Sequence, residues 1–258
     1  MAELKVVSYN VNGIRSALKK GLADWLKAFA PDVVCFQEMK VHIDDFDPKP
    51  FEDLGYYSNL FGAEKKGYSG VAIMSKIKPD NVVNGFDLKH YDIEGRAVRI
   101  DIGDLSILNT YFPSGTSGDE RQAVKMKFLD EFFDYIHKLE KKRPKLLIAG
   151  DYNIANKEID IWNPVSNKNT SGFKPEERAW MDKYFESGFI DTFRYFHKEP
   201  HRYSWWTARF PTVRAQNKGW RIDYIAATKN LEKSLVEAEM YPDVKQSDHC
   251  PVYCKVKV

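Results

Sequence analysis

The chain combines short, continuous apolar runs with longer segments of helical periodicity. Apolar runs bounded by glycine, proline, asparagine or aspartate predict buried strands, here over residues 4–9, 32–36, 56–61, 71–75, 145–149, 219–225 and 252–258. Residues 97–102 and 105–111 alternate apolar and polar positions, which predicts an antiparallel pair with one face in water. Apolar residues at helical spacing predict helices over residues 18–29, 121–142 and 175–186.

No internal repeat, low-complexity tract or linker interrupts this pattern. We therefore find no domain boundary and expect a single domain over residues 1–258. Length alone leaves open one large α/β or all-β domain, or two small ones. In each case the chain is long enough to bury a substantial core without disulfides or structural metals.

Composition indicates the cellular compartment more clearly than it indicates the function. The formal net charge is only +2, which neither requires nor excludes a nucleic-acid partner, because a basic face can be balanced by an acidic one. The cysteines are odd in number and include no Cys-x-x-Cys pair, so neither a disulfide framework nor a structural zinc site is expected. With no signal peptide and no membrane-spanning run, we expect a cytoplasmic protein, or a nuclear one in a eukaryote.

Polar side chains recur where predicted strands end or begin. Each could be an ordinary turn or cap; for Asn10-Val11-Asn12-Gly13 the local sequence favours a turn. Asp223 is the only acid in an otherwise apolar strand, and a buried carboxylate needs a partner such as His249. Six such positions in one chain are improbable as accidents: Asn10, Glu38, Tyr111, Asp151 with Asn153, Asp223, and Asp248 with His249.

These residue types indicate a reaction class. Carboxylate and amide oxygens are hard ligands suited to Mg²⁺ or Mn²⁺. The chain has no nucleophilic serine or cysteine motif, no phosphate-binding P-loop and no dinucleotide fingerprint. Acids, amides and a histidine without these motifs indicate metal-assisted attack of water on a phosphate ester.

Two loops and one aromatic segment add candidate contacts. Residues 65–70 place lysines, a tyrosine and glycines at a hairpin tip, which suits a phosphate backbone but equally a solvated turn. Residues 209–218 look like an exposed basic loop. Residues 203–207 predict a core strand on which Trp205 and Trp206 point to opposite faces, so that one of them can line a cleft.

Taken in order, the motifs resemble a known enzyme class. They are Ser8-Tyr9-Asn10-Val11-Asn12-Gly13, Phe36-Gln37-Glu38, Gly67-Tyr68-Ser69-Gly70-Val71, Tyr111-Phe112-Pro113, Gly150-Asp151-Tyr152-Asn153, Gly219-Trp220-Arg221-Ile222-Asp223-Tyr224 and Ser247-Asp248-His249. The sequence resembles the exonuclease III class of apurinic/apyrimidinic endonucleases, within the endonuclease/exonuclease/phosphatase superfamily, over nearly its whole length. The resemblance implies a deoxyribonuclease I-like α/β fold: a four-layer sandwich of two mixed sheets packed face to face, with helices outside.

The resemblance also implies a metal site and catalytic roles. It implies Mg²⁺, with Mn²⁺ as a possible substitute, held chiefly by Glu38 with Asn10 and Asp248 close by. It also offers a second position near Asp151, Asn153 and His249, and it leaves open whether one or two ions act. By the same resemblance, Asp223 orients His249 toward the scissile phosphate, Asp151 handles the attacking water or the leaving oxygen, Asn153 fixes that arrangement, and Tyr111 binds the phosphate.

Contacts to a nucleic acid are implied in the same way. Gly67, Tyr68 and Arg96 match contacts to the DNA backbone, while Trp205 and Trp220 match the walls of a pocket for a baseless sugar. The implied partner of the monomeric protein is double-stranded DNA with abasic sites or blocked 3′ ends. Two positions depart from one common pattern, because Asn12 stands where many members have Asp and Ser114 where some have Asn.

The implied activity is hydrolysis of the phosphodiester bond 5′ to an abasic site. A 3′→5′ exonuclease or 3′-phosphatase/phosphodiesterase activity can accompany it, in a ratio that the sequence does not assign. One alternative is another phosphoesterase of the superfamily, acting on inositol phosphates, a lipid head group or RNA; the motif around Trp220 argues against it. The other is a catalytically inert DNA-binding protein, in which one of the six positions should be lost, and none is.

Overall fold

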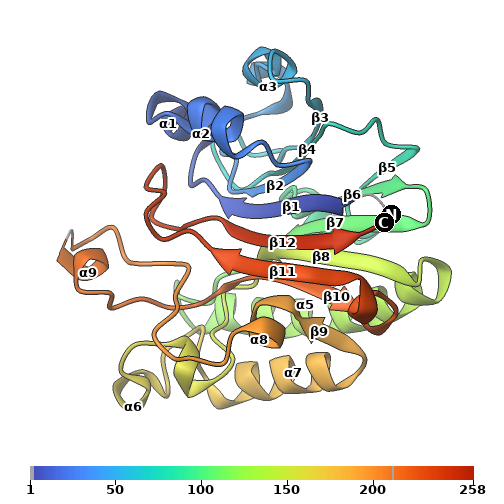
Figure 1. Cartoon of the computed structure of the whole chain (residues 1–258). Coiled ribbons are helices and arrows are strands. Elements are labelled where there is room, and N and C mark those ends of the chain that lie inside the picture. The colour runs from blue at the N-terminus through green and yellow to red at the C-terminus, as the bar shows by residue number, and fades with distance from the viewer. Residues whose placement is uncertain (1–2, 211) are drawn as a thin grey trace.

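Two β-sheets packed face to face form the centre of the molecule (Figure 1). The computed structural model describes residues 3–210 and 212–258, so Pro211 of the predicted basic loop lies outside the described residues. Within them, the first sheet has six strands, in the order β11 (Leu235–Met240), β12 (Val252–Lys257), β1 (Glu3–Asn10), β2 (Val33–Gln37), β4 (Val71–Ser75) and β3 (Tyr57–Phe61).

The second sheet also has six strands within the described residues. Its order is β5 (Asn81–Asn84), β6 (Ala97–Ile102), β7 (Leu105–Tyr111), β8 (Lys145–Asp151), β10 (Asp223–Thr228) and β9 (Phe189–Asp191). Both sheets are mixed, because β1 pairs with β2 and β7 pairs with β8 in parallel, whereas the other neighbours are antiparallel.

Helices cover the outer faces of this pair of sheets. Figure 1 shows α1 (Ile14–Lys19), α2 (Leu22–Phe29) and α3 (Lys49–Glu52) on the side of the first sheet. On the other side lie α5 (Asp119–Lys142) and α7 (Pro175–Glu186). The remaining helical segments are short: α4 (Lys89–Asp92), α6 (Pro164–Asn167), α8 (Thr192–Phe196), α9 (Thr212–Ala215), η1 (Ile43–Asp45), η2 (Glu158–Asp160) and η3 (Lys229–Ser234).

Three apolar clusters fill the three spaces between the four layers. One cluster fills the space between the sheets and takes Val6 and Ile73 from the first sheet and Leu147 from the second. A second joins the outer face of the second sheet to α5 and α7, with Phe128 of α5 among its members. The third joins the first sheet to α1 and α2. The sheets are therefore buried except at edge strands such as β3 and β5, which are partly exposed, and the expected four-layer α/β sandwich is confirmed.

Three local expectations were wrong. Residues 97–102 and 105–111 do form an antiparallel pair, but neither face lies in water, because both strands are almost entirely buried between the facing sheet and the outer helices. The apolar spacing over residues 18–29 predicts one helix, but the structure has α1 and α2, separated at Lys20 and Gly21. Gly21 has φ +86°, a left-handed conformation that ends the first helix, and it precedes the first residue of the second. Residues 203–207 are not a strand; Trp205 makes only isolated bridges, to Trp220 and His249.

A buried amide joins the two sheets close to the carboxyl end of β2. Asn109 of β7 donates from Nδ2 to the carbonyls of Phe36 (2.8 Å) and Ala72 (2.9 Å) in the facing sheet. Its Oδ1 accepts a 2.7 Å hydrogen bond from Gln37. Because Gln37 directly precedes Glu38, this cross-link fixes where the chain leaves the first sheet.

Candidate active site

Strand register brings three of the expected residues together at one edge of the second sheet. Tyr111 at the end of β7 is the register partner of Asp151 at the end of β8. Asp151 in turn lies opposite Asp223, the first residue of antiparallel β10. Two carboxylates directly opposite each other on adjacent strands repel, so this arrangement requires compensating positive charge or a shared proton.

The facing sheet contributes Asn10 and Glu38. Asn10 ends β1 beside Gln37 at the end of parallel β2, and Glu38 follows immediately. The Asn10 Nδ2 atom donates 2.9 Å hydrogen bonds to Glu38 Oε1 and to Asp151 Oδ2. One buried amide therefore draws together carboxylates from opposite sheets.

His249 reaches this group from the loop that precedes β12. Its Nδ1 lies 2.9 Å from Asp223 Oδ2 and 3.1 Å from Oδ1, so the partner expected from the sequence is the one observed. Ser204, which sequence reasoning missed, donates to Asp223 Oδ2 at 2.6 Å. His249 Nε2 faces Asp151 Oδ2 at 3.9 Å.

Burial and mutual charge shift the protonation of this cluster. Burial alone disfavours a charged imidazole, but Asp223, Asp151 and Asp248 outweigh it and raise the pKa of His249 to about 10. Burial, together with the charge of Asp223, raises the pKa of Asp151. Burial, with Glu38 and Asp151 nearby, also raises the pKa of Tyr111. At neutral pH His249 is therefore an imidazolium and Tyr111 a neutral phenol, whereas the Asp151 carboxyl group can both take up and release a proton.

Glu38, Asp151 and His249 can hold a metal ion. Each offers one ligand atom, and these atoms all lie within 4.8 Å of one another. Carboxylate oxygens beside the Asn10 amide form a donor set that suits a hard divalent cation. The residues present therefore fit the metal that the sequence analysis expects.

Asp248 and Asn153 are held differently. Asp248 is outside this three-residue group; its carboxylate accepts hydrogen bonds from Asn12 Nδ2 (2.9 Å) and Trp205 Nε1 (3.1 Å). Although burial favours the neutral acid, His249 and these donors keep the pKa of Asp248 below its ordinary value. The Asn153 side chain donates to the Phe112 carbonyl at 3.0 Å.

A lysine that the sequence analysis did not single out also enters the site. Lys40 Nζ lies 2.8 Å from Glu38 Oε2 and 2.5 Å from Asn12 Oδ1. Although burial acts in the opposite direction, this ammonium group and Asn10 hold the pKa of Glu38 below its ordinary value. A lysine two residues after a glutamate is too common a pattern to have indicated this pair.

Three residues of the site have a left-handed backbone conformation. Asn12, Glu38 and Asn153 all have positive φ, at 45°, 49° and 53°. Non-glycine residues in this conformation are strained, and they persist where surrounding contacts fix them. For Asn153 the contact comes from the fully buried Lys125, whose Nζ donates to the Asn153 carbonyl at 2.8 Å and lies 2.6 Å from Glu177.

A cavity of about 300 Å³ opens above these groups. The Trp205 and Trp220 rings lie 6.0 Å apart at right angles, and both line it, whereas Trp206 is buried. At Gly172 a Cβ would lie 3.0 Å from Trp220 and from the Asn153 carbonyl, so only glycine allows this approach. The lining residues are Glu38, Tyr111, Ser114, Thr116, Asp151, Asn153, Thr170, Ser171, Gly172, Trp205, Trp220, Ile222, Asp248 and His249.

The residues expected to contact a DNA backbone differ in how deeply they are buried. Gly67 is exposed and Tyr68 half-buried, in the loop between β3 and β4. Arg96 is buried; its guanidinium pairs with Glu94 (2.6 Å), donates to the Tyr111 carbonyl (2.8 Å) and reaches the Tyr68 hydroxyl (3.4 Å). Arg96 therefore supports Tyr68 and Tyr111 from behind.

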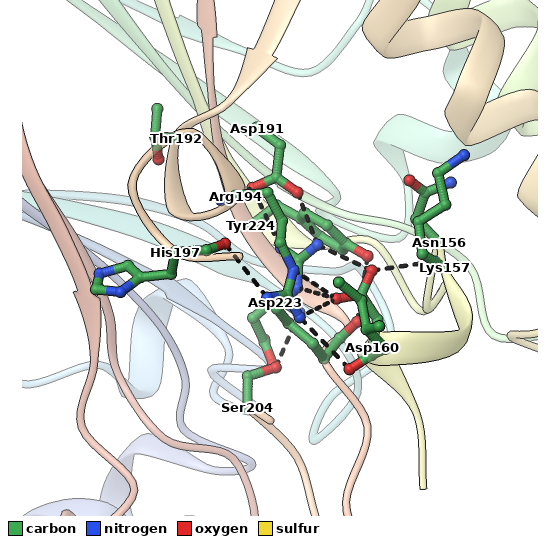
Figure 2. A network of polar contacts seen from close by, with 12 residues as sticks. Asn156, Lys157, Asp160, Asp191, Thr192, Arg194, His197, Ser204, Asp223 and Tyr224 are labelled. Carbon is green, nitrogen blue, oxygen red and sulfur yellow. Dashed lines mark hydrogen bonds and ion pairs between the residues drawn. The ribbon is translucent and has the colours of Figure 1, made fainter. Parts of the chain in front are cut away.

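A buried ion-pair network around Asp160, Asp191 and Arg194 (Figure 2) supports the segment that contains Arg221. Arg221 donates to both oxygens of Asp160 (2.8 and 3.1 Å) and to Asp191. Arg194 adds 3.0 and 2.6 Å hydrogen bonds to Asp160. Arg221 lies between Trp220 and Asp223 in sequence. The network therefore fixes the positions of Trp220, which lines the cavity, and of Asp223, which pairs with His249.

Comparison with known proteins agrees with this geometry. Residues 7–249 match the endonuclease/exonuclease/phosphatase family. The chain belongs to this family. It is 37% identical to an exodeoxyribonuclease of Bacillus subtilis (strain 168) over 96% of this chain and 98% of that protein. A DNA-(apurinic or apyrimidinic site) endonuclease of Dictyostelium discoideum is 34% identical, over 97% of this chain and 70% of its own length.

A solved structure of a family member shares the whole fold. The structure of an AP endonuclease from Archaeoglobus fulgidus matches with a TM-score of 0.92 and 32% identity, covering 99% of this chain and 100% of that one. Family membership and fold class are therefore both confirmed, and the family's members are hydrolytic enzymes. Among the described residues, no helix is both long and apolar enough to span a membrane.

The Asp160 network yields a prediction for stability. Although burial opposes it, the guanidinium groups of Arg221 and Arg194 keep the pKa of Asp160 below its ordinary value. This interaction therefore stabilises the fold above the unfolded-state pKa of about 3.9 and is lost as the pH falls through the lower folded-state value. Asp160→Asn should lower the free energy of unfolding by roughly 3–5 kcal/mol at neutral pH, because buried positive charge loses its partner.

Urea unfolding of both proteins at neutral and acidic pH measures the effect. The difference in the free energy of unfolding between wild type and Asp160→Asn should become smaller as the pH falls below about 4. Asp182→Asn is the control, because Asp182 pairs with Lys157 on the surface and its loss should cost at most about 1 kcal/mol. Equal costs for the two variants would contradict the role given to the network.

Proposed function

We propose that the protein is a Mg²⁺-dependent DNA repair nuclease that hydrolyses the phosphodiester bond 5′ to an abasic site in duplex DNA. One observation carries the proposal. The buried Asp223–His249 pair, Asp151 and Glu38 converge at the base of a cavity that Trp205 and Trp220 wall. The relatives named as exodeoxyribonuclease and as apurinic or apyrimidinic site endonuclease support the same reaction class.

The residues divide the work of hydrolysis among them. Asp223 holds His249 as an imidazolium, whose Nε2–H donates to a phosphate oxygen. The neutral Tyr111 hydroxyl donates to the same phosphate. Asp151, with its raised pKa, takes the proton of the attacking water, and Asn153 holds Asp151 through its backbone amide, which donates to Asp151 Oδ1 at 2.9 Å. The water oxygen bonds to phosphorus and the bond from phosphorus to O3′ breaks. The leaving O3′ takes up a proton from solvent, which balances the proton that Asp151 took from the water and later releases.

A divalent cation completes this site. Glu38 would hold it, with oxygens of Asn10, Asp151, Asn153 and Asp248 close by, and such ligands suit Mg²⁺ and also Mn²⁺. His249 lies within reach of the same position, but as an imidazolium it has no free lone pair, so it would face the phosphate. When bound, the cation would stabilise the negative charge that builds on the phosphate oxygens. Lys40 supplies the positive charge beside Glu38 that balances the acids in the metal-free protein.

The aromatic walls of the cavity favour a substrate without a base. The space of about 300 Å³ would admit a deoxyribose that has flipped out of the helix, and the rings of Trp205 and Trp220, set at right angles, would hinder the entry of a base. Gly67 and Tyr68, supported by Arg96, would contact the DNA backbone on one side. The basic loop of residues 209–218 would contact it on the other, since backbone contacts position the duplex.

A second activity has support of its own. The Bacillus subtilis relative is named an exodeoxyribonuclease, and the same hydrolytic groups would cleave a 3′-terminal phosphodiester or remove a 3′ block. We therefore include 3′→5′ exonuclease and 3′-phosphatase/phosphodiesterase action in the proposal. The protein would act as a single-domain monomer where chromosomal DNA lies, in the cytoplasm of a prokaryote or the nucleus of a eukaryote.

The direct test uses a labelled duplex with one abasic site. The protein with Mg²⁺ should cut once, 5′ to the site, leaving a 3′-hydroxyl and a 5′-sugar phosphate, and a chelator should abolish the reaction. An intact duplex of the same sequence controls for unspecific cutting, and a recessed 3′ end measures exonuclease action. Hydrolysis of inositol phosphates, a lipid head group or RNA without incision at the abasic site would contradict the proposal.

A pair of variants tests the assignment of Asp223. Asp223→Asn removes the charge that orients His249, so kcat should fall by roughly 10³–10⁴-fold, as when the acid of a catalytic triad is replaced. Binding of the abasic duplex, measured by fluorescence anisotropy, should survive. Asp101→Asn is the matched control, because Asp101 is a buried acid of the same sheet on β6; its kcat should stay near wild type. Equal loss of binding and turnover in Asp223→Asn would make Asp223 structural.

A further inference from the structure

The loop of residues 242–249, named the catalytic loop, carries Asp248 and His249, and the Arg214 side chain contacts it along its whole length. The Arg214 guanidinium donates to four carbonyl oxygens of this loop. The distances are 2.8 Å to Pro242, 2.8 Å to Val244, 2.7 Å to Ser247 and 3.4 Å to His249. The convergence is unusual, because these four carbonyls span the whole loop and meet at a single cation.

Arg214 belongs to α9, in the basic loop of residues 209–218. Its guanidinium lies over the ring of buried Trp206, with Cζ 4.5 Å from the ring centroid. The next residue toward the N-terminus, Trp205, donates to Asp248 and lines the cavity. Arg214 therefore ties together the basic loop, the tryptophan segment and the catalytic loop.

Few backbone hydrogen bonds fix the catalytic loop within the described residues. The amide of Val244 donates to Tyr241, and the Asp248 carbonyl accepts from Trp206. Between Val244 and Asp248, Arg214 donates to the carbonyls of Val244 and Ser247. Because arginine has five donors in a rigid planar fork, it can satisfy several carbonyls at once and fix their spacing.

We propose that Arg214 is a positioning residue: it fixes the catalytic loop so that His249 and Asp248 meet the groups of the two sheets. The inference rests on the proposed function, because it explains how that site is assembled. Arg214 lies in a basic loop, where a contact to a DNA phosphate is the obvious role. Yet its guanidinium donors are directed at the catalytic loop, so its loss should impair turnover more than binding.

The size of the effect follows from the geometry. His249 must meet Asp223 on one side and the phosphate on the other, and a misplacement of about 1 Å at such a group costs roughly 10²-fold in rate. Arg214→Ala should therefore lower kcat by roughly ten- to hundredfold, while KM on the abasic duplex changes little. Arg214→Lys should recover part of the loss, because lysine keeps the charge but not the planar fork.

Chemical rescue separates positioning from general stability. Arg214→Ala leaves the four carbonyls and the Trp206 face without their cation, so guanidinium chloride at a low, non-denaturing concentration should raise its kcat. Equal potassium chloride controls for ionic strength. Arg143→Ala is the matched control, because Arg143 also donates to two turn carbonyls, of Gly103 and Leu105, but at the opposite end of β7 from Tyr111. Its kcat should match wild type, with or without guanidinium.

Hydrogen exchange of residues 242–250 adds a readout that does not depend on the reaction. It should be faster in Arg214→Ala than in wild type and unchanged in Arg143→Ala. Absent incision by the wild-type protein would refute the proposed function, and exchange would still test Arg214. The inference is overturned if exchange in this loop is unchanged, if KM rises while kcat holds, or if a loss of kcat is matched by Arg143→Ala and is not rescued by guanidinium.

Discussion

The ion pair between Asp223 and His249 is the interaction on which the site depends. Both groups are buried, and charge removed from water is stable only when it is paired and hydrogen-bonded. The pair meets this condition because Nδ1 faces the Asp223 carboxylate and Ser204 donates to the same carboxylate. The result is an imidazole held as a cation beside Asp151, and in the function that we propose this cation would donate to a phosphate oxygen.

The fold makes this arrangement possible by joining the ends of two sheets. Register places Asp151 between Tyr111 and Asp223 in one sheet, and Asn10 links that sheet to Glu38 of the other. Buried ion pairs then support the loops around the site: Lys125 behind Asn153, and Asp160 with Arg221 behind the segment from Trp220 to Asp223. Removing one partner of a buried ion pair is costly, but the pair as a whole adds little stability compared with apolar residues of the same volume. We therefore infer that these pairs serve mainly to fix positions.

The sequence was most informative where a polar side chain follows directly after a predicted strand. Runs of apolar residues predicted most of the strands, and acids or amides at their ends marked the site. The contacts of Glu38 with Lys40 and of Asp223 with Ser204 could not be predicted, because they depend on how loops close over the sheet ends. Residues 203–207 look like a strand but are held by isolated bridges and by Trp206, and the division between α1 and α2 depends on the conformation of Gly21.

The central claim is that Asp223 holds His249 as a buried imidazolium. Nitrogen-15 NMR of the histidine side chains measures this directly in the metal-free protein, with Asp223→Asn assigning the His249 signals. Both ring nitrogens of His249 should remain protonated at about pH 8, because the pKa is raised to about 10. A neutral tautomer at that pH, with titration near the ordinary value of about 6.5, would contradict it.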